Sequence, residues 1–195
     1  MLMAGMGTEA FIFFMSTFEK APKEYSWEKA YPQIIEDESD LEDGKTAVQK
    51  LNKIFKTACI ASDHAGFKLK EDIKDYLIDN NFSVFDLGPY NVRSVVYPDY
   101  AKRLGNRFKL KKSNVGILVC GSGTGMAISA NKIKTIRAAV CYNLKSTRLS
   151  RQHNNANIIA LGSRLTKKKL SLKLVDIFLK TKFEGGRHLR RVKKI

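Results

Sequence analysis

The 195-residue sequence has few cysteines and histidines, three of each, and no long apolar run. No stretch approaches the roughly 20 apolar residues that a membrane-spanning helix needs, so a transmembrane protein is excluded. Cys59, Cys120 and Cys141 are widely spaced and form no C-x-x-C pair, which argues against a disulfide framework and against a structural zinc site. A reduced intracellular setting fits this cysteine usage best, and we expect a cytoplasmic protein.

Acidic residues are scarce as well, 19 against 35 Lys and Arg, and their placement divides the chain. Residues 1–44 hold three basic and ten acidic residues, a net charge of −7, whereas residues 45–195 hold 32 basic and nine acidic residues, a net charge of +23. This shift predicts an acidic, loosely ordered N-terminal extension over residues 1–55 and one basic domain over residues 56–195. The extension lacks the cationic start of a secretory signal and the arginines of a mitochondrial presequence, so we expect no targeting peptide.

From residue 57 onward, short apolar runs alternate with amphipathic segments of helical length. The apolar runs predict buried strands at residues 58–61, 83–87, 115–119, 136–141 and 157–161. The amphipathic segments predict helices at residues 68–79, 100–110, 126–133, 144–151 and 167–180. Continuous apolar strands separated by helices indicate a parallel sheet covered on both faces. We therefore predict an α/β fold, a single doubly wound, Rossmann-like domain with a five-stranded parallel sheet.

Open α/β sheets bind ligands at the carboxyl ends of their strands, and we expect three polar clusters of the sequence to lie there. The clusters are SDHAG at residues 62–66, CGSGTG at 120–125 and SRQHN at 150–154. In the second cluster, Gly121, Gly123 and Gly125 allow close approach of a ligand to backbone N–H groups that could hold an oxyanion or a phosphate. Met126 replaces the third glycine of a G-x-G-x-x-G fingerprint, which disfavours NAD. The turn alone is also compatible with a purely structural connection.

Acid–base chemistry is indicated by a thiol and two histidines at these positions. Cys120 stands at a strand end facing a helix N-terminus, which stabilises a thiolate, although a small buried core residue is the alternative. Cys59 and Cys141 lie in or at the end of strands and are predicted core residues. His64 and His153 lie on strand-end or loop segments, where imidazoles can transfer protons. No second carboxylate or histidine follows Asp63-His64 at ligand spacing, so no metal site is predicted.

The C-terminal segment carries two arginines with a spacing suited to an anion. Arg187 and Arg191 are four residues apart and would share one face of a helical turn, where they could clamp a phosphate monoester. The alternative is a basic tail in solvent or against nucleic acid. The segment alone does not decide between these interpretations.

Eight short segments of the basic domain occur in the order found in one known family. They are SDHAGFKLK at 62–70, YPDYA at 97–101, CGSGTG at 120–125, ANK at 130–132, IRA at 136–138, SRQHN at 150–154, LGSR at 161–164 and EGGRH at 184–188. Through them, residues 57–195 resemble type B ribose-5-phosphate isomerase, in the family that includes the galactose-6-phosphate isomerase subunits. Residues 1–55 lie outside the resemblance.

The resemblance implies an isomerase of the non-oxidative pentose phosphate pathway that interconverts ribose 5-phosphate and ribulose 5-phosphate without metal or organic cofactor. Cys120 matches the family's general base, which moves a proton between C2 and C1 through an enediolate. Some members use a glutamate after the last glycine of the turn, but Met126 holds that position here. Ser122 matches a hydroxyl residue near the reacting carbons. The backbone N–H groups that would stabilise the enediolate oxygen belong to Gly121, Gly123, Thr124 and Gly125.

The other matching residues divide into ring-opening, sugar and phosphate contacts. His153 matches the residue that opens the furanose ring, and Asp63 matches one that assists by accepting a hydrogen bond from a sugar hydroxyl. Tyr97 and Asn154 match sugar-contacting positions. The implied phosphate set is His64, Arg164, Arg187 and Arg191. In the family the active site is completed across a homodimer interface, so we expect a homodimer, with a tetramer as the larger alternative.

Two other functions stay open on the sequence. The same fold and proton transfer could act on a six-carbon aldose 6-phosphate such as that of galactose or allose. A basic nucleic-acid-binding module could use residues 109–112, residues 167–169 and the C-terminal tail. It lacks interleaved aromatic residues for stacking and matches no motif that reads the major groove, so nucleic acid is the less favoured partner.

Overall fold

The computed structural model describes residues 56–109 and 115–195 of the chain. The predicted acidic extension over residues 1–55 lies outside the described residues, as does the basic stretch at residues 110–112. Among the helices of the described part, none combines the length and the apolar character needed to cross a membrane.

One parallel sheet forms the centre of this domain, with the strand order β2-β1-β3-β5-β4. The strands are β1 (Lys56–Ser62), β2 (Phe82–Asp86), β3 (Val115–Cys120), β4 (Ala138–Val140) and β5 (Ile158–Gly162). Every residue of β3 is buried, because this strand lies between β1 and β5 and both of its faces are covered. The predicted five-stranded parallel sheet is confirmed.

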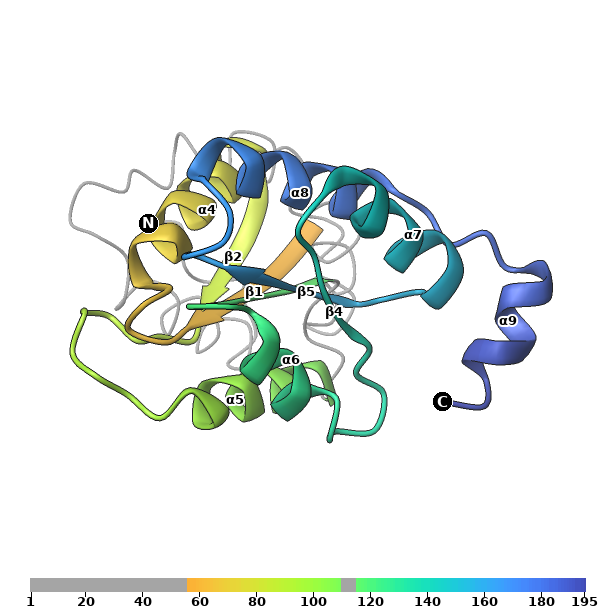
Figure 1. The fold of residues 1–195 in the computed structure, drawn as a ribbon, viewed down its shortest axis with the longest axis horizontal. Helices are drawn as coiled ribbons and strands as arrows, with labels where there is room; N and C mark the ends of the chain where they lie inside the picture. Colours follow the sequence, from red (N-terminus) through yellow and green to blue (C-terminus); the bar gives the residue numbers. More distant parts are fainter. Residues whose placement is uncertain (1–55, 110–114) are drawn as a thin grey trace, which may run out of the picture. The chain divides into compact units, whose positions relative to one another are not determined.

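Helices cover both faces of the sheet (Figure 1). One face carries α4 (Phe67–Asp79), α7 (Leu144–Asn154) and α8 (Lys168–Lys180), and the other carries α5 (Tyr97–Lys109) and α6 (Thr124–Ala130). Two apolar clusters hold these layers together. Ile73 of α4 and Phe178 of α8 pack in the first cluster, and Leu104 of α5 and Met126 of α6 pack in the second. A short final helix, α9 (Gly186–Val192), follows α8.

Several element boundaries differ from the sequence-based prediction. The helix α5 begins at Tyr97 rather than at residue 100. The helix α6 begins at Thr124, directly after a left-handed Gly123, instead of spanning residues 126–133. The strand β4 has three residues rather than six, because side-chain amides bond the backbone at its start: Ala138 N–H donates to Asn131 Oδ1 at 2.8 Å, and Arg137 N–H donates to Asn157 Oδ1 at 2.8 Å.

A buried lysine connects α4 to the end of β2. Lys70 is fully buried, and its Nζ lies 2.5 Å from Asp86 Oδ2 and 2.6 Å from Glu71 Oε1. Asp86 Oδ1 also accepts a hydrogen bond from Gly88 N–H at 2.9 Å, at the start of the segment that leads to α5. Because water cannot reach the ammonium group, its charge depends on these carboxylates.

We therefore expect Asp86→Asn to lower the free energy of unfolding by about 3 kcal/mol, since it leaves a buried ammonium group without its nearest charge partner. Lys70→Met removes that charge and fills the same space, so it should cost less. Chemical denaturation of the two variants beside the wild type measures both effects. If Asp86→Asn lowered the free energy of unfolding less than Lys70→Met does, the buried ammonium group would not depend on the Asp86 carboxylate.

Candidate active site

A cavity of about 420 Å³ opens at the carboxyl ends of β1, β3 and β5. It is lined by Asp63, Tyr97, Cys120, Gly121, Ser122, Gly125, Arg164 and Leu165. Asp63 follows β1, Cys120 ends β3 and Arg164 lies just beyond β5. The strand order reverses between β1 and β3, so the cavity lies at the switch point where open α/β sheets bind ligands. Seven of the residues predicted for the site line this one cavity.

The thiol of Cys120 is held by the turn that follows it. The residue is 5% exposed, and Gly123 N–H donates a hydrogen bond to Sγ at 3.0 Å. This contact needs the backbone of Gly123 at a φ of 81°, which glycine adopts without strain. The turn thereby fixes the sulfur in the cavity wall, with one backbone donor directed at it.

A carboxylate lies at the neighbouring strand end. Asp63 is 8% exposed, and its Oδ1 accepts a hydrogen bond from Gly66 N–H at 2.8 Å. Gly66 allows this turn because α4 starts directly against β3: a Cβ atom at this position would lie 2.4 Å from the carbonyl oxygen of Val119. The start of α4 thereby holds Asp63 beside Cys120 in the cavity wall.

The loop after β5 brings a cation to the same cavity. Ser163 N–H donates to the carbonyl oxygen of Cys120 at 2.8 Å, and Arg164 N–H donates to that of Gly121 at 3.0 Å. Ser163 Oγ also donates to the carbonyl oxygen of Ala65 at 2.9 Å, which links all three strand-end loops. The Arg164 side chain lies over Gly121, where a Cβ atom would be 3.4 Å from its Nε.

Three further predicted residues lie at or near the cavity. The ring of Tyr97 packs directly on Gly125, where a Cβ atom would be 2.8 Å from the ring carbon Cζ. His64 is half-buried next to Asp63, and its Nδ1 accepts a hydrogen bond from Val95 N–H at 3.4 Å. Thr124 begins α6, and its N–H donates to Ser122 Oγ at 3.3 Å.

Four predicted residues are not brought to this cavity. His153 and Asn154 end α7, and Arg187 and Arg191 lie on α9. Figure 1 places α9 and the end of α7 at the side of the sheet opposite to the carboxyl ends of the strands. Within one chain, the predicted site is therefore divided into two separate parts.

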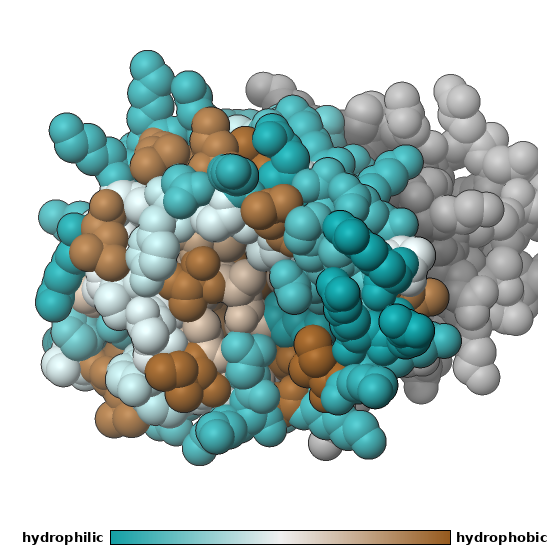
Figure 2. Space-filling view, turned by 45° about the vertical axis from the view of Figure 1, so that its right-hand side comes forward, coloured by the Kyte–Doolittle hydropathy of each residue, from teal (hydrophilic) through white to brown (hydrophobic). Residues whose placement is uncertain are grey.

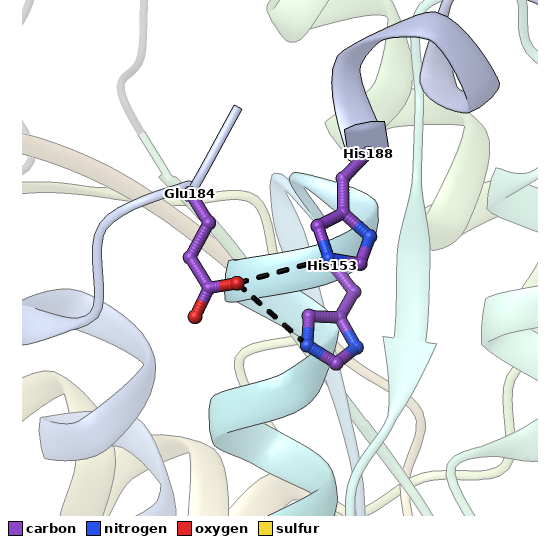
Figure 3. Close-up of side chains that lie close together, drawn as sticks. All are labelled: His153, Glu184 and His188. Carbon is purple, nitrogen blue, oxygen red and sulfur yellow. Dashed lines mark ion pairs between the residues drawn. The ribbon is translucent and has the colours of Figure 1, made fainter. Parts of the chain in front are cut away.

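The second part contains two residues that the sequence analysis missed, Glu184 and His188. The rings of His153 and His188 stack with centroids 4.2 Å apart and planes 6° from parallel. Glu184 Oε2 lies 3.8 Å from His153 Nε2 and 3.7 Å from His188 Nε2, as Figure 3 shows. Burial, and then the neighbouring His153, lower the pKa of His188. The four-residue spacing of Glu184 and His188 was the only signal in the sequence that could have indicated the cluster.

The fold and the cavity define an α/β enzyme with a thiol, a carboxylate and a cation at the carboxyl edge of its sheet. A family model described as Ribose/Galactose Isomerase matches residues 58–195. The chain belongs to this family and is an aldose–ketose isomerase, so the predicted family is confirmed. A second model, described as the GldL N-terminal domain, matches residues 1–37.

Individual relatives cover the same part of the chain. A putative sugar phosphate isomerase of Rickettsia bellii is 46% identical over 136 residues, which are 70% of this chain and 94% of that protein. Ribose-5-phosphate isomerase B of Escherichia coli is 40% identical over 141 residues, 72% of this chain and 95% of that protein. The crystal structure of a ribose 5-phosphate isomerase from Thermotoga maritima has a TM-score of 0.70 and 48% identity, and the match covers 71% of this chain and 95% of that one.

Proposed function

We propose that the protein interconverts ribose 5-phosphate and ribulose 5-phosphate, a reaction of the non-oxidative pentose phosphate pathway. The observation that carries the proposal is the Cys120 thiol, placed in the cavity wall with Gly123 N–H directed at its sulfur. Relatives named ribose-5-phosphate isomerase, from Escherichia coli and Thermotoga maritima, support the pentose phosphate as substrate. A cation beside the cavity, Arg164, suits the phosphate group.

The chemistry requires a base that removes the proton from C2 of the aldose and returns it to C1. Cys120 takes the proton, the electron pair of the broken C2–H bond forms the C1–C2 double bond, and the aldehyde oxygen takes up the charge of the enediolate. A proton then passes from the C2 hydroxyl to the C1 oxygen, and Cys120 returns its proton to C1 as the C2 carbonyl forms. Met126, which occupies the position of the alternative glutamate base, is fully buried in the core and cannot reach the substrate. Gly123 N–H is engaged by Sγ and Thr124 N–H by Ser122, so the other N–H groups of the turn hold the enediolate oxygen.

The separation of the site into two parts supports a homodimer. His153, Asn154, Arg187 and Arg191 cannot contribute to the cavity of their own chain, because they lie at the opposite side of the sheet. In a symmetric pair, each chain supplies these residues to its partner's cavity, where His153 opens the sugar ring and the arginines bind phosphate. His64 is the remaining phosphate contact, and Asp63 assists ring opening.

Exposed apolar side chains near the cavity support this pairing. Tyr97 and Leu165 line the cavity and are 40% and 59% exposed, and the adjacent Val96 is 65% exposed. On the side that carries α9, which Figure 2 brings forward, apolar residues are scattered singly among polar ones. Large apolar side chains gathered at a site are typical of a surface that another protein covers.

The direct test is isomerisation by the full-length protein in EDTA, with ribose 5-phosphate compared with allose 6-phosphate and galactose 6-phosphate. We expect kcat/KM to be at least about tenfold higher for the pentose phosphate, because an extra carbon separates the phosphate from the reacting carbons and misplaces one of them. Higher kcat/KM for a hexose phosphate would transfer the proposal to that substrate. No turnover of any of the three would contradict it.

A further inference from the structure

We propose that His153, Glu184 and His188 form a binding site for zinc or a similar divalent transition metal, and that an ion bound there inhibits the enzyme. The proposed isomerisation uses only one of these three side chains, although all three meet at one point (Figure 3). The metal site is independent of the proposed function. Only the inhibitory consequence rests on it.

The positions of the donor atoms carry the proposal. One nitrogen of each imidazole and one oxygen of Glu184 all lie within 4.8 Å of one another. Donors in a tetrahedral zinc site stand about 3.4 Å apart, given zinc–ligand bonds of about 2.1 Å. The 3.7 and 3.8 Å separations between Glu184 and the two histidines are therefore only slightly too long. The stacked rings are parallel, so one imidazole tilts for the two lone pairs to converge on an ion.

The surroundings hold the donors in place while leaving access to them. His188 is 7% exposed, whereas the side chains of His153 and Glu184 are 37% and 48% exposed. Arg187 Nε donates to His188 Nε2 at 3.4 Å, so a metal ion has to displace this hydrogen bond to reach the lone pair of the nitrogen. That contact is long and gives way to a metal ion. The cationic side chains of Arg187 and Arg191 nearby keep the affinity below that of a structural zinc site.

The donor set selects the kind of ion. Two imidazoles and one carboxylate form a three-ligand set that leaves a fourth position open, the arrangement typical of accessible zinc sites. Imidazole nitrogen suits zinc, nickel and copper, whereas magnesium and calcium require mainly oxygen ligands. We therefore expect Zn²⁺ to bind and Mg²⁺ not to bind.

An ion at this position affects the proposed reaction through His153. A metal bound to Nε2 occupies the lone pair that the imidazole needs to carry a proton to the ring oxygen of the sugar. Opening of the cyclic substrate then stops, although the thiol on the other part of the site is untouched. Zinc should accordingly inhibit turnover of ribose 5-phosphate.

The test is a titration of the metal-stripped, full-length protein with ZnCl₂ in competition with a chromophoric zinc chelator. We expect one strongly competing zinc ion per chain in the wild type, and an affinity lowered at least about tenfold in Glu184→Gln and in His188→Gln. Cys120→Ser is the matched control, because the thiol is a potential zinc ligand in the other part of the site, and this variant should bind zinc as the wild type does. Circular dichroism verifies that each variant is folded.

Three outcomes would overturn the site: no competition by the wild type, unchanged affinity in both cluster variants, or loss of binding in Cys120→Ser. In a second measurement, zinc should inhibit the wild type at concentrations that leave Glu184→Gln unaffected, relative to each protein in EDTA. If zinc bound at the cluster but did not inhibit the enzyme, the proposed inhibition would be wrong and the metal site would stand. A wild type without isomerase activity would contradict the proposed function, whereas the titration would still decide on the metal site.

Discussion

Cys120→Ala should lower kcat for ribose 5-phosphate by roughly 10²- to 10⁴-fold, the scale on which a positioned general base contributes to proton transfer. The alanine leaves the cavity and the turn in place but removes the only thiol in the cavity lining. The affinity for the substrate should change little, because the phosphate is held by cationic side chains rather than by the sulfur. Kinetics give the first quantity, and calorimetric binding of ribose 5-phosphate gives the second.

The matched control for this variant is Cys141→Ala. Cys141 is fully buried in the apolar cluster on the α4 and α8 side of the sheet, and burial raises the pKa of its thiol, so it takes no part in proton transfer at neutral pH. Its replacement should cost some stability and leave kcat within about twofold. An unchanged kcat in Cys120→Ala would exclude the thiol as the base and leave Asp63 as the nearest alternative.

His153→Asn should slow turnover of ribose 5-phosphate by at least about 100-fold, because asparagine cannot transfer a proton to the ring oxygen. The same substitution should have a much smaller effect on erythrose 4-phosphate. The phosphate of this four-carbon aldose occupies the oxygen that a furanose ring would need, so the sugar is already open. The ratio of the two losses isolates ring opening from the proton transfer between C1 and C2.

His188→Asn serves as the control, since this residue stacks on His153 but is not assigned a step in the reaction. A general disturbance of the stack would lower turnover of both substrates in both variants. If His153→Asn lowered turnover of ribose 5-phosphate and of erythrose 4-phosphate equally, ring opening would not be a function of this residue.

The sheet and the cavity half of the site were predictable because both depend on local pattern and on the geometry of parallel strands. The apolar runs of β1 and β3 are short and uninterrupted, and parallel strands end at one edge of the sheet. Asp63 and Cys120 immediately follow or end such runs, so their meeting in one cavity follows from the fold class alone. Gly66, which lies between these two residues in the sequence, allows α4 to pack closely against β3. This packing is a contact between segments that are distant in the sequence.

The division of the site was not predictable from the residues themselves. His153 lies only 33 positions after Cys120, yet α7 runs back along the sheet and ends at its other side. The motif resemblance alone implied that both residues belong to one active site completed across a homodimer interface, and a single chain does not bring them together. The cluster of His153 with Glu184 and His188 depends on how the segment before α9 packs against α7, and no local pattern encodes that packing.

The most direct test of the central claim, an isomerase site built from two chains, uses the two inactive variants together. Cys120→Ala and His153→Asn are coexpressed with different affinity tags, and the mixed dimer is purified through both tags. One of its two cavities then combines an intact Cys120 with an intact His153 from the partner. We predict that the mixed dimer recovers about half of the wild-type activity on ribose 5-phosphate, since one of two equivalent sites is complete. Activity no higher than that of the parent variants would contradict the account, because a site contained in one chain gains nothing from mixing.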